Sequence, residues 1–262
     1  FNSTYHHFNP GVIYYKLSNN DTITSDETNN SKIFIGLENR IFIENNLTIG
    51  NFFTANLGLN ASYYIIDNKD YTSIEPRIVI NFMLPLDFSL KANYSEMEQY
   101  VHLLTNNSLG LTADIWVPSN SQMPPSRSKQ TSFGLFKYFK EKDIEFSAIG
   151  YYKTSNNLIS YKEGAVFRGN AENWEDKIET RGEGISYGLE LLLQKSQGRT
   201  TGWISYTYAK TTHQFANINQ GKPFNFKYDR RHDFSVVIIH KLKENIFVSG
   251  TWVYGSGYPY TM

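Results

Sequence analysis

Several absences narrow the class of protein before any pattern is considered. The 262 residues contain no cysteine, so neither a disulfide framework nor a thiolate metal site can form. Basic and acidic residues balance at 25 each, and a formal net charge of +0 gives no electrostatic basis for binding nucleic acid. No apolar run approaches the roughly 18–20 residues of a transmembrane helix. Membrane strands are not excluded by this, because they hide their apolar residues by alternation.

Nucleotide-binding motifs and natural chain ends are also missing. The glycines of 182–188 have the wrong spacing for a dinucleotide fingerprint, no helical pattern follows them, and no P-loop is present. Glycine within a strand instead marks a bend or a bulge. The chain begins at Phe1 without a basic or apolar leader, and it stops at Met262 where a strand reaches a loop. We therefore expect the chain to be one section of a longer protein.

What is present is alternation of polar and apolar residues over segments of about ten residues, the period of a strand with two different faces. In 143–152 the apolar and aromatic side chains fall on one face, whereas Glu145 and Ser147 fall on the other. The segment 86–94 repeats this plan, with apolar residues at every second position. Such strands suit a wall with lipid on one side and water or a plug on the other.

We predict about eleven strands, each with the ~9–11 residues that a tilted strand needs to cross hydrocarbon. They are 8–17, 32–44, 47–66, 73–83, 86–95, 131–139, 143–153, 187–195, 200–211, 232–242 and 246–254. Short connections at 45–46, 84–85, 140–142, 196–199 and 243–245 alternate with long ones at 18–31, 67–72, 96–129, 154–183 and 212–230. Short periplasmic turns and long extracellular loops are typical of outer-membrane barrels. The pattern therefore predicts an all-β, antiparallel transmembrane β-barrel segment with its long loops outside the cell.

The aromatic content supports this prediction. Aromatic residues make up 16% of the chain, with 19 Tyr and 18 Phe, and a barrel uses them for its two interfacial girdles. Trp203 and Trp252 lie near strand ends, where an indole anchors in the headgroup layer. The predicted lipid-facing side chains include Leu189, Leu191, Leu193, Ile204, Tyr206, Tyr208, Phe234, Val236 and Ile238.

Longer stretches of the sequence resemble a known family. They are 75–77 (Glu-Pro-Arg), 94–104, 114–118, 150–164, 187–195, 198–206, 228–234 and 251–257. Together and in this order, they resemble the barrel of TonB-dependent outer-membrane receptors of the Bacteroidetes type. The resemblance covers nearly the whole chain.

The resemblance implies a barrel of about 22 strands with a plugged lumen. Such a receptor lies in the outer membrane of a Gram-negative bacterium and imports a nutrient with energy relayed by the TonB complex. It implies as partners the outer-membrane lipid, a plug domain and an unknown nutrient ligand; a surface lipoprotein accompanies some members. Residues 1–262 then form part of the barrel, with the plug and the C-terminal strands lying outside this chain. It implies no enzyme activity and no cofactor.

Aromatic residues in the long loops are the candidate ligand-binding residues, because rings stack on sugars, peptides and chelates. They are Tyr100, His102, Trp116 and Trp174. The alternative is that these side chains pack the loops onto one another or onto the plug.

Charged residues on the inward side of the strands are the second group of candidates. Glu75 and Arg77 share one face, and Lys91 with Asp87 follows on the next strand. They form either a charged track toward a plug or ligand, or a ladder of cross-strand ion pairs.

The histidines give no basis for a metal site, because no set of ligands has a useful spacing. Asp229 with His232 is the one hint of a catalytic pair, and Asp–Arg contacts at a loop base are the alternative role for 228–232. Beside the receptor, the residues leave a passive porin or adhesin-type barrel open, and also a soluble β-sheet binding module.

Overall fold

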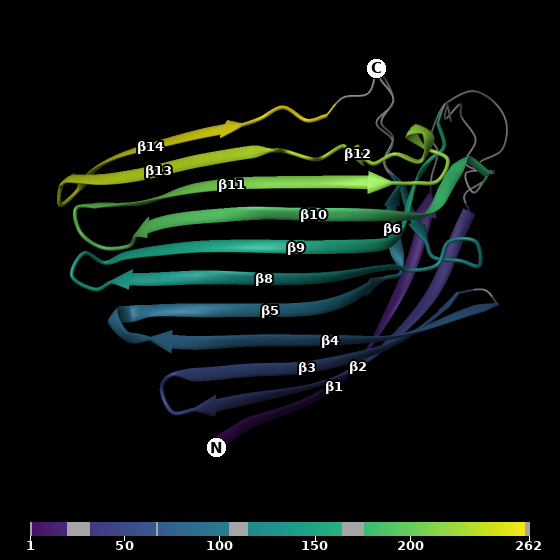
Figure 1. Ribbon diagram of the computed structural model, residues 1–262, viewed down its shortest axis with the longest axis horizontal. Helices are drawn as coiled ribbons and strands as arrows, with labels where there is room; N and C mark the ends of the chain where they lie inside the picture. The colour runs from purple at the N-terminus through teal and green to yellow at the C-terminus, as the bar shows by residue number, and fades with distance from the viewer. Residues whose placement is uncertain (1, 20–31, 67, 105–114, 164–175, 260–262) are drawn as a thin grey trace.

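The chain folds into a large, curved antiparallel sheet (Figure 1). This computed structural model describes residues 2–19, 32–66, 68–104, 115–163 and 176–259, and for 2–35 and 115 the backbone alone. The strands are β1 (Asn2–Asn19), β2 (Lys32–Ile49), β3 (Phe53–Ile66), β4 (Lys69–Leu84), β5 (Phe88–Gln99), β6 (Val101–Leu104), β7 (Ile115–Pro118), β8 (Ser126–Phe139), β9 (Ile144–Tyr161), β10 (Ile178–Lys195), β11 (Thr200–Gln214), β12 (Phe224–Asn225), β13 (His232–Lys243) and β14 (Ile246–Gly255).

The sheet is a meander in chain order. Its neighbours run β1-β2-β3-β4-β5-β8-β9-β10-β11-β13-β14, and the short β12 pairs with β11. The tight turns at 50–52, 85–87, 140–143, 196–199 and 244–245 lie together at the left end of the sheet in Figure 1. The other ends of these strands lie at the opposite end of the sheet, together with β6 and β12. The predicted all-β barrel segment with short and long connections on opposite sides is therefore confirmed.

One predicted turn is wrong. Asn45 and Asn46 continue β2 and pair with Leu57 and Asn56 of β3, and the chain turns at 50–52. Gly50 has φ of 55°, a backbone conformation that glycine adopts without steric cost. Asn46 instead accepts a hydrogen bond from the Asn56 amide at 2.6 Å. Asparagine is common both in turns and on a polar strand face, so its presence alone does not separate the two.

Two predicted long loops, 96–129 and 154–183, are partly strand. β5 extends to Gln99, β9 extends to Tyr161, and β10 begins at Ile178. The segment 96–129 also holds β6, β7 and the start of β8. The ends of these strands far from the tight turns are rich in polar residues, and their few apolar residues, such as the adjacent Leu158 and Ile159, do not alternate regularly, so they lack the pattern on which the predicted boundaries depended. The strands thus project beyond the length that hydrocarbon requires.

Strand register gathers the apolar residues on one face of the sheet, which we call the outer face. Leu57 lies opposite Ile78, and Ile78 lies opposite Tyr94. In the same way, strand pairing places Leu191 of β10 between Ala148 of β9 and Tyr206 of β11. Large apolar side chains of this face are exposed, which is unusual for so extensive a patch in a soluble domain.

The opposite, inner face carries a small buried core at the end with the long connections. The β6–β7 hairpin approaches β9 through β6 and β1 through β7, so it bridges the concave side of the sheet. Its core joins hairpin residues to Tyr64 and Ile66 on β3 and Ile178 on β10. The two described strands of the connection between β5 and β8, β6 and β7, therefore fold inward over the inner face.

Candidate functional site

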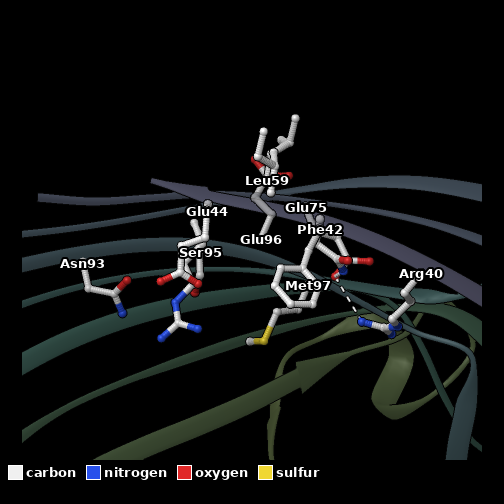
Figure 2. A pocket seen from close by; sticks show the side chains of 13 residues that line it. Arg40, Phe42, Glu44, Leu59, Glu75, Asn93, Ser95, Glu96 and Met97 are labelled. Carbon is white, nitrogen blue, oxygen red and sulfur yellow. Dashed lines mark hydrogen bonds and ion pairs between the residues drawn. The ribbon is translucent and has the colours of Figure 1, made fainter. Parts of the chain in front are cut away.

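The inner face of β2–β5 forms a cavity of about 770 Å³. Arg40, Phe42, Glu75 and Met97 project to the same side of the ribbon in Figure 2, whereas Leu59 projects from the other side. Its lining residues also include Glu44, Asn60, Arg77, Asn93, Ser95 and Glu96. The cavity thus combines charged groups with an exposed thioether and a phenyl ring, which suits an amphipathic occupant.

The buried Glu75 carboxylate has several hydrogen-bond donors and one ion-pair partner in this cavity. The carboxylate accepts hydrogen bonds from Asn60 at 3.0 Å, Ser62 at 3.1 Å and Ser73 at 3.2 Å. The Arg40 guanidinium lies 3.6 Å away and also binds Glu38, which is fully buried. A buried carboxylate is costly unless it is hydrogen-bonded and paired, and this network meets both conditions.

Arg77 and Lys91, the other predicted inward charges, do not join this network. Arg77 lines the cavity and has no ion-pair partner within the part of the chain that the structure describes. The Lys91 ammonium lies 4.4 Å from the centroid of the Phe136 ring, a cation–π contact. Asp87 pairs with Lys140 at 2.7 Å rather than with Lys91. The structure places Glu75 and Arg77 together on the cavity wall, but it forms no ion pair between them.

Tyr100 belongs to the core under the hairpin. The side chain is 2% exposed, and its ring stacks on Tyr64 with centroids 4.5 Å apart and planes 15° apart. The hydroxyl lies 2.6 Å from the Ser62 hydroxyl, which in turn binds Glu75. Burial raises the pKa of Tyr100 to about 12, with the Ser62 contact opposing this shift. Tyr100 therefore links the hairpin to the charged network below it.

His102 is held in the same hairpin, 4% exposed. Nε2 lies 2.8 Å from the Ser119 hydroxyl and Nδ1 lies 3.2 Å from the Ser126 hydroxyl. Burial lowers the pKa of His102 from its ordinary 6.5 to about 4, because nothing in this pocket compensates an imidazolium. Both ring nitrogens of His102 contact serine hydroxyls. Like Tyr100, His102 is therefore buried among residues of this chain. That they contact a ligand stays a prediction.

Trp116 differs from these two residues. It lies on β7 opposite Leu103 and is 49% exposed, so its indole is available at the surface. Trp174 lies outside the described residues. The candidate aromatics are therefore separated: two lie within the hairpin core and one lies on its outside.

The remaining hints from the sequence have structural partners. Asp229 accepts hydrogen bonds from the Thr211 amide at 2.7 Å and from Arg231 at 2.8 Å. His232 Nδ1 lies 2.9 Å from the Tyr206 hydroxyl. Asp229 and His232 thus have different partners and do not form an acid–base pair, whereas the Asp–Arg contact at the loop base is present.

No metal site is formed by the described residues, among which no three His, Asp or Glu side chains cluster suitably. Among the same residues, none of the helices has the length and apolar character of a membrane-spanning helix.

Sequence reasoning missed Arg40, Glu38 and Tyr64. Arg40 shares one side of 32–44 with Lys32 and Glu38, and its place on that side was its only signal. The contacts of all three residues depend on strand register and on the hairpin, which the local sequence does not specify.

Comparison with known proteins identifies the family. The family model "TonB dependent receptor-like, beta-barrel" matches residues 1–260. The chain therefore belongs to the TonB-dependent receptor β-barrel family, as the resemblance in its sequence predicted. Members of this family are outer-membrane receptors and transporters of Gram-negative bacteria rather than enzymes. That the chain is of the Bacteroidetes type stays a prediction. No curated protein matches the chain.

Solved structures share the fold at low sequence identity. The ferric-catecholate import receptor Fiu of E. coli K12 has a TM-score of 0.60 at 13% identity, over 93% of this chain and 40% of that chain. The FrpB iron transporter of Neisseria meningitidis has a TM-score of 0.60 at 11% identity, over 85% and 33%. The FpvAI chain of a complex with pyocin S2 has a TM-score of 0.60 at 11% identity, over 93% and 33%. This chain thus spans 33–40% of the length of these relatives.

Proposed function

We propose that this chain is part of the barrel wall and outer vestibule of a TonB-dependent receptor for energised nutrient uptake. The observation that carries the proposal is the two-faced sheet. Its outer face exposes apolar side chains from many strands, and its inner face holds a charged cavity of about 770 Å³. A wall with these two faces separates lipid from an aqueous or plugged lumen.

Further strands would close this wall. Within the described residues β1 pairs with β2 alone and β14 pairs with β13 alone, so the sheet has two open edges. Open edges in hydrocarbon leave backbone groups without hydrogen bonds, which lipid cannot supply. We expect strands outside this chain to complete a barrel of about 22 strands, the size that has a plugged lumen.

The proposed uptake involves three steps. Outer loops and the exposed Trp116 capture the nutrient, a plug rearranges when the TonB complex pulls its tether, and the nutrient passes along the inner face. The cavity charges of Arg77 and Glu75 would face the plug or the passing ligand. The outer-membrane lipid covers the outer face, and a surface lipoprotein over the loops is an additional partner of this proposal.

Liposome swelling of the full-length protein tests the proposal against a passive barrel. Incorporated into liposomes and diluted into raffinose, a plugged receptor should leave the swelling rate at that of protein-free liposomes. A passive porin would raise it. A second assay measures binding of the full-length protein to the purified periplasmic domain of TonB. Absence of binding together with swelling would overturn the proposal; absence of both would favour an adhesin-type barrel.

A further inference from the structure

A second, smaller cavity lies at the outer end of the inner face. Its volume is about 180 Å³, and most of its lining comes from β6, β9, β11 and β12. Its lining residues are Gln99, His102, Leu103, Ser126, Leu158, Ile159, Ser160, His213, Phe224 and Phe226. This volume accommodates one six-membered ring with a small substituent and excludes larger groups.

Two glycines of β10 bring aromatic rings directly against the wall beside this cavity. A Cβ at Gly182 would lie 2.2 Å from the Phe215 ring, and a Cβ at Gly184 would lie 2.7 Å from Leu158 and 3.3 Å from His213. Any other residue would push these side chains away from the strand. The glycine pair thus makes room for side chains that line or support the cavity.

A backbone reversal completes the aromatic lining. The segment after β11 returns and pairs as β12, so that Phe224 lies opposite His213 and the Phe226 amide donates to the Thr211 carbonyl at 3.0 Å. The His213 ring stacks on Phe226 with centroids 4.3 Å apart and planes 28° apart. The Phe215 and Phe224 rings lie 6.2 Å apart. Rings at these separations and tilts favour further aromatic contact.

The polar side chains that line this cavity are neutral, and the ring nitrogens of one of them, His213, have no hydrogen-bond partner among the described residues. The lining contains no Asp, Glu, Lys or Arg, in contrast to the larger cavity with Arg40, Arg77 and Glu75. His102 uses both ring nitrogens on serines, whereas His213 has ring contacts but no hydrogen-bond partner within the described residues. An ionised ligand group would lose its hydration here without gaining a counter-charge.

We infer that this cavity is a subsite for an uncharged aromatic ring bearing a hydroxyl group. The ring would pack against Phe224 and Phe226, and its hydroxyl would hydrogen-bond to a His213 ring nitrogen. The inference rests on the proposed function in one respect, that the ring belongs to the imported ligand. Binding to the subsite needs no energy source and is therefore measured separately from uptake.

The test uses 4-fluorophenol as the probe and ¹⁹F NMR line broadening as the readout, with the full-length protein in nanodiscs. The charged, similarly sized 4-fluorobenzoate is the matched probe, and empty nanodiscs give the contribution of lipid. We expect saturable broadening of 4-fluorophenol and none of 4-fluorobenzoate. The His213→Phe variant keeps the ring but removes its nitrogens, and it should weaken 4-fluorophenol binding about three- to tenfold, the effect of one neutral hydrogen bond.

A pair of glycine variants separates the subsite from general effects on folding. Gly184→Ala should weaken binding, because the new methyl group crowds Leu158 and His213. Gly250→Ala should leave binding unchanged, because nothing lies within 4 Å of its new Cβ. Equal binding of the two probes, or unchanged 4-fluorophenol binding in His213→Phe, would overturn the subsite. His213-dependent binding in a protein that swells liposomes would instead count against the proposed uptake alone.

Discussion

The outer face of the wall and the core under the β6–β7 hairpin are both apolar, yet one is exposed and the other is buried. Leu57 and Leu189 of the outer face are 45% and 42% exposed, whereas Leu104 and Val117 of the hairpin are fully buried. Protein atoms cover the hairpin residues, and on the proposed function lipid covers the others. The same residue types are therefore expected to respond to substitution by different rules in the two regions.

Removing a large side chain from the hairpin core should have the largest effect. Tyr100→Ala deletes the ring stacked on Tyr64 and the hydroxyl contact with Ser62. We expect the free energy of opening the hairpin to fall by about 3–5 kcal/mol, the usual cost of deleting a buried aromatic side chain. Hydrogen exchange of the β6 and β7 amides in the full-length protein measures this loss.

Trp116→Ala is the matched control, because it truncates an exposed aromatic side chain of the same hairpin. It should change exchange of these amides far less. If Tyr100→Ala accelerated exchange equally in β8 and β9, the hairpin would not be a separate unit and the contrast between the two regions would fail.

A charge on the outer face should have the next largest effect. Leu189 lies in the middle of β10, between Gly150 and Tyr208 of the neighbouring strands. Leu189→Arg should cost about 2–4 kcal/mol, as arginine does at the midplane of a bilayer-facing barrel wall. Urea titration of the full-length protein folded into lipid vesicles gives the free energy of unfolding.

The adjacent position supplies the control for this variant. Glu190 is exposed on the inner face, so Glu190→Arg introduces the same side chain without contact to lipid. We expect it to be nearly neutral. Equal destabilisation by both variants would show that the outer face is not the lipid-covered side.

The contrast also explains which parts of the fold could be predicted from sequence. The wall was predictable, because a period of two reports the face of every residue once one face meets lipid. The alternation alone therefore assigns neighbours such as Leu189 and Glu190 to opposite faces. The turn at 50–52 was misplaced, because Asn45 and Asn46 carry a turn-like signal on a polar strand face.

The hairpin and the site contacts were not predictable in the same way. Residues 96–129 contain no sustained alternation, and Tyr100, Leu104 and Val117 pack against Tyr64 and Ile178 from distant strands. The partnership of Arg40 with Glu75 requires the exact pairing of β2, β3 and β4. The roles of Gly182 and Gly184 likewise depend on rings contributed by β11.

Lowering the pH should destabilise the β6–β7 hairpin but not the wall, and this is a smaller effect than those of the substitutions above. Well above pH 6.5 the His102 imidazole is neutral in both the closed and the detached hairpin, so its full contribution to stability is present. Between pH 6.5 and the lowered pKa of about 4, the detached hairpin binds a proton that the closed hairpin does not. The free energy of opening the hairpin should therefore decrease as the pH is lowered, and at pH 5 it should be about 2 kcal/mol smaller than at neutral pH.

Hydrogen exchange of the β6 and β7 amides at pH 7 and pH 5, corrected for the intrinsic pH dependence of exchange, measures this change. The same measurement on His102→Gln removes the imidazole while the neighbouring carboxylates titrate in both proteins, so the difference isolates His102. Because the wall strand β8 contains no histidine, its protection should stay constant. An equal pH response in His102→Gln would show that carboxylates, rather than the buried imidazole, make the hairpin the acid-sensitive region.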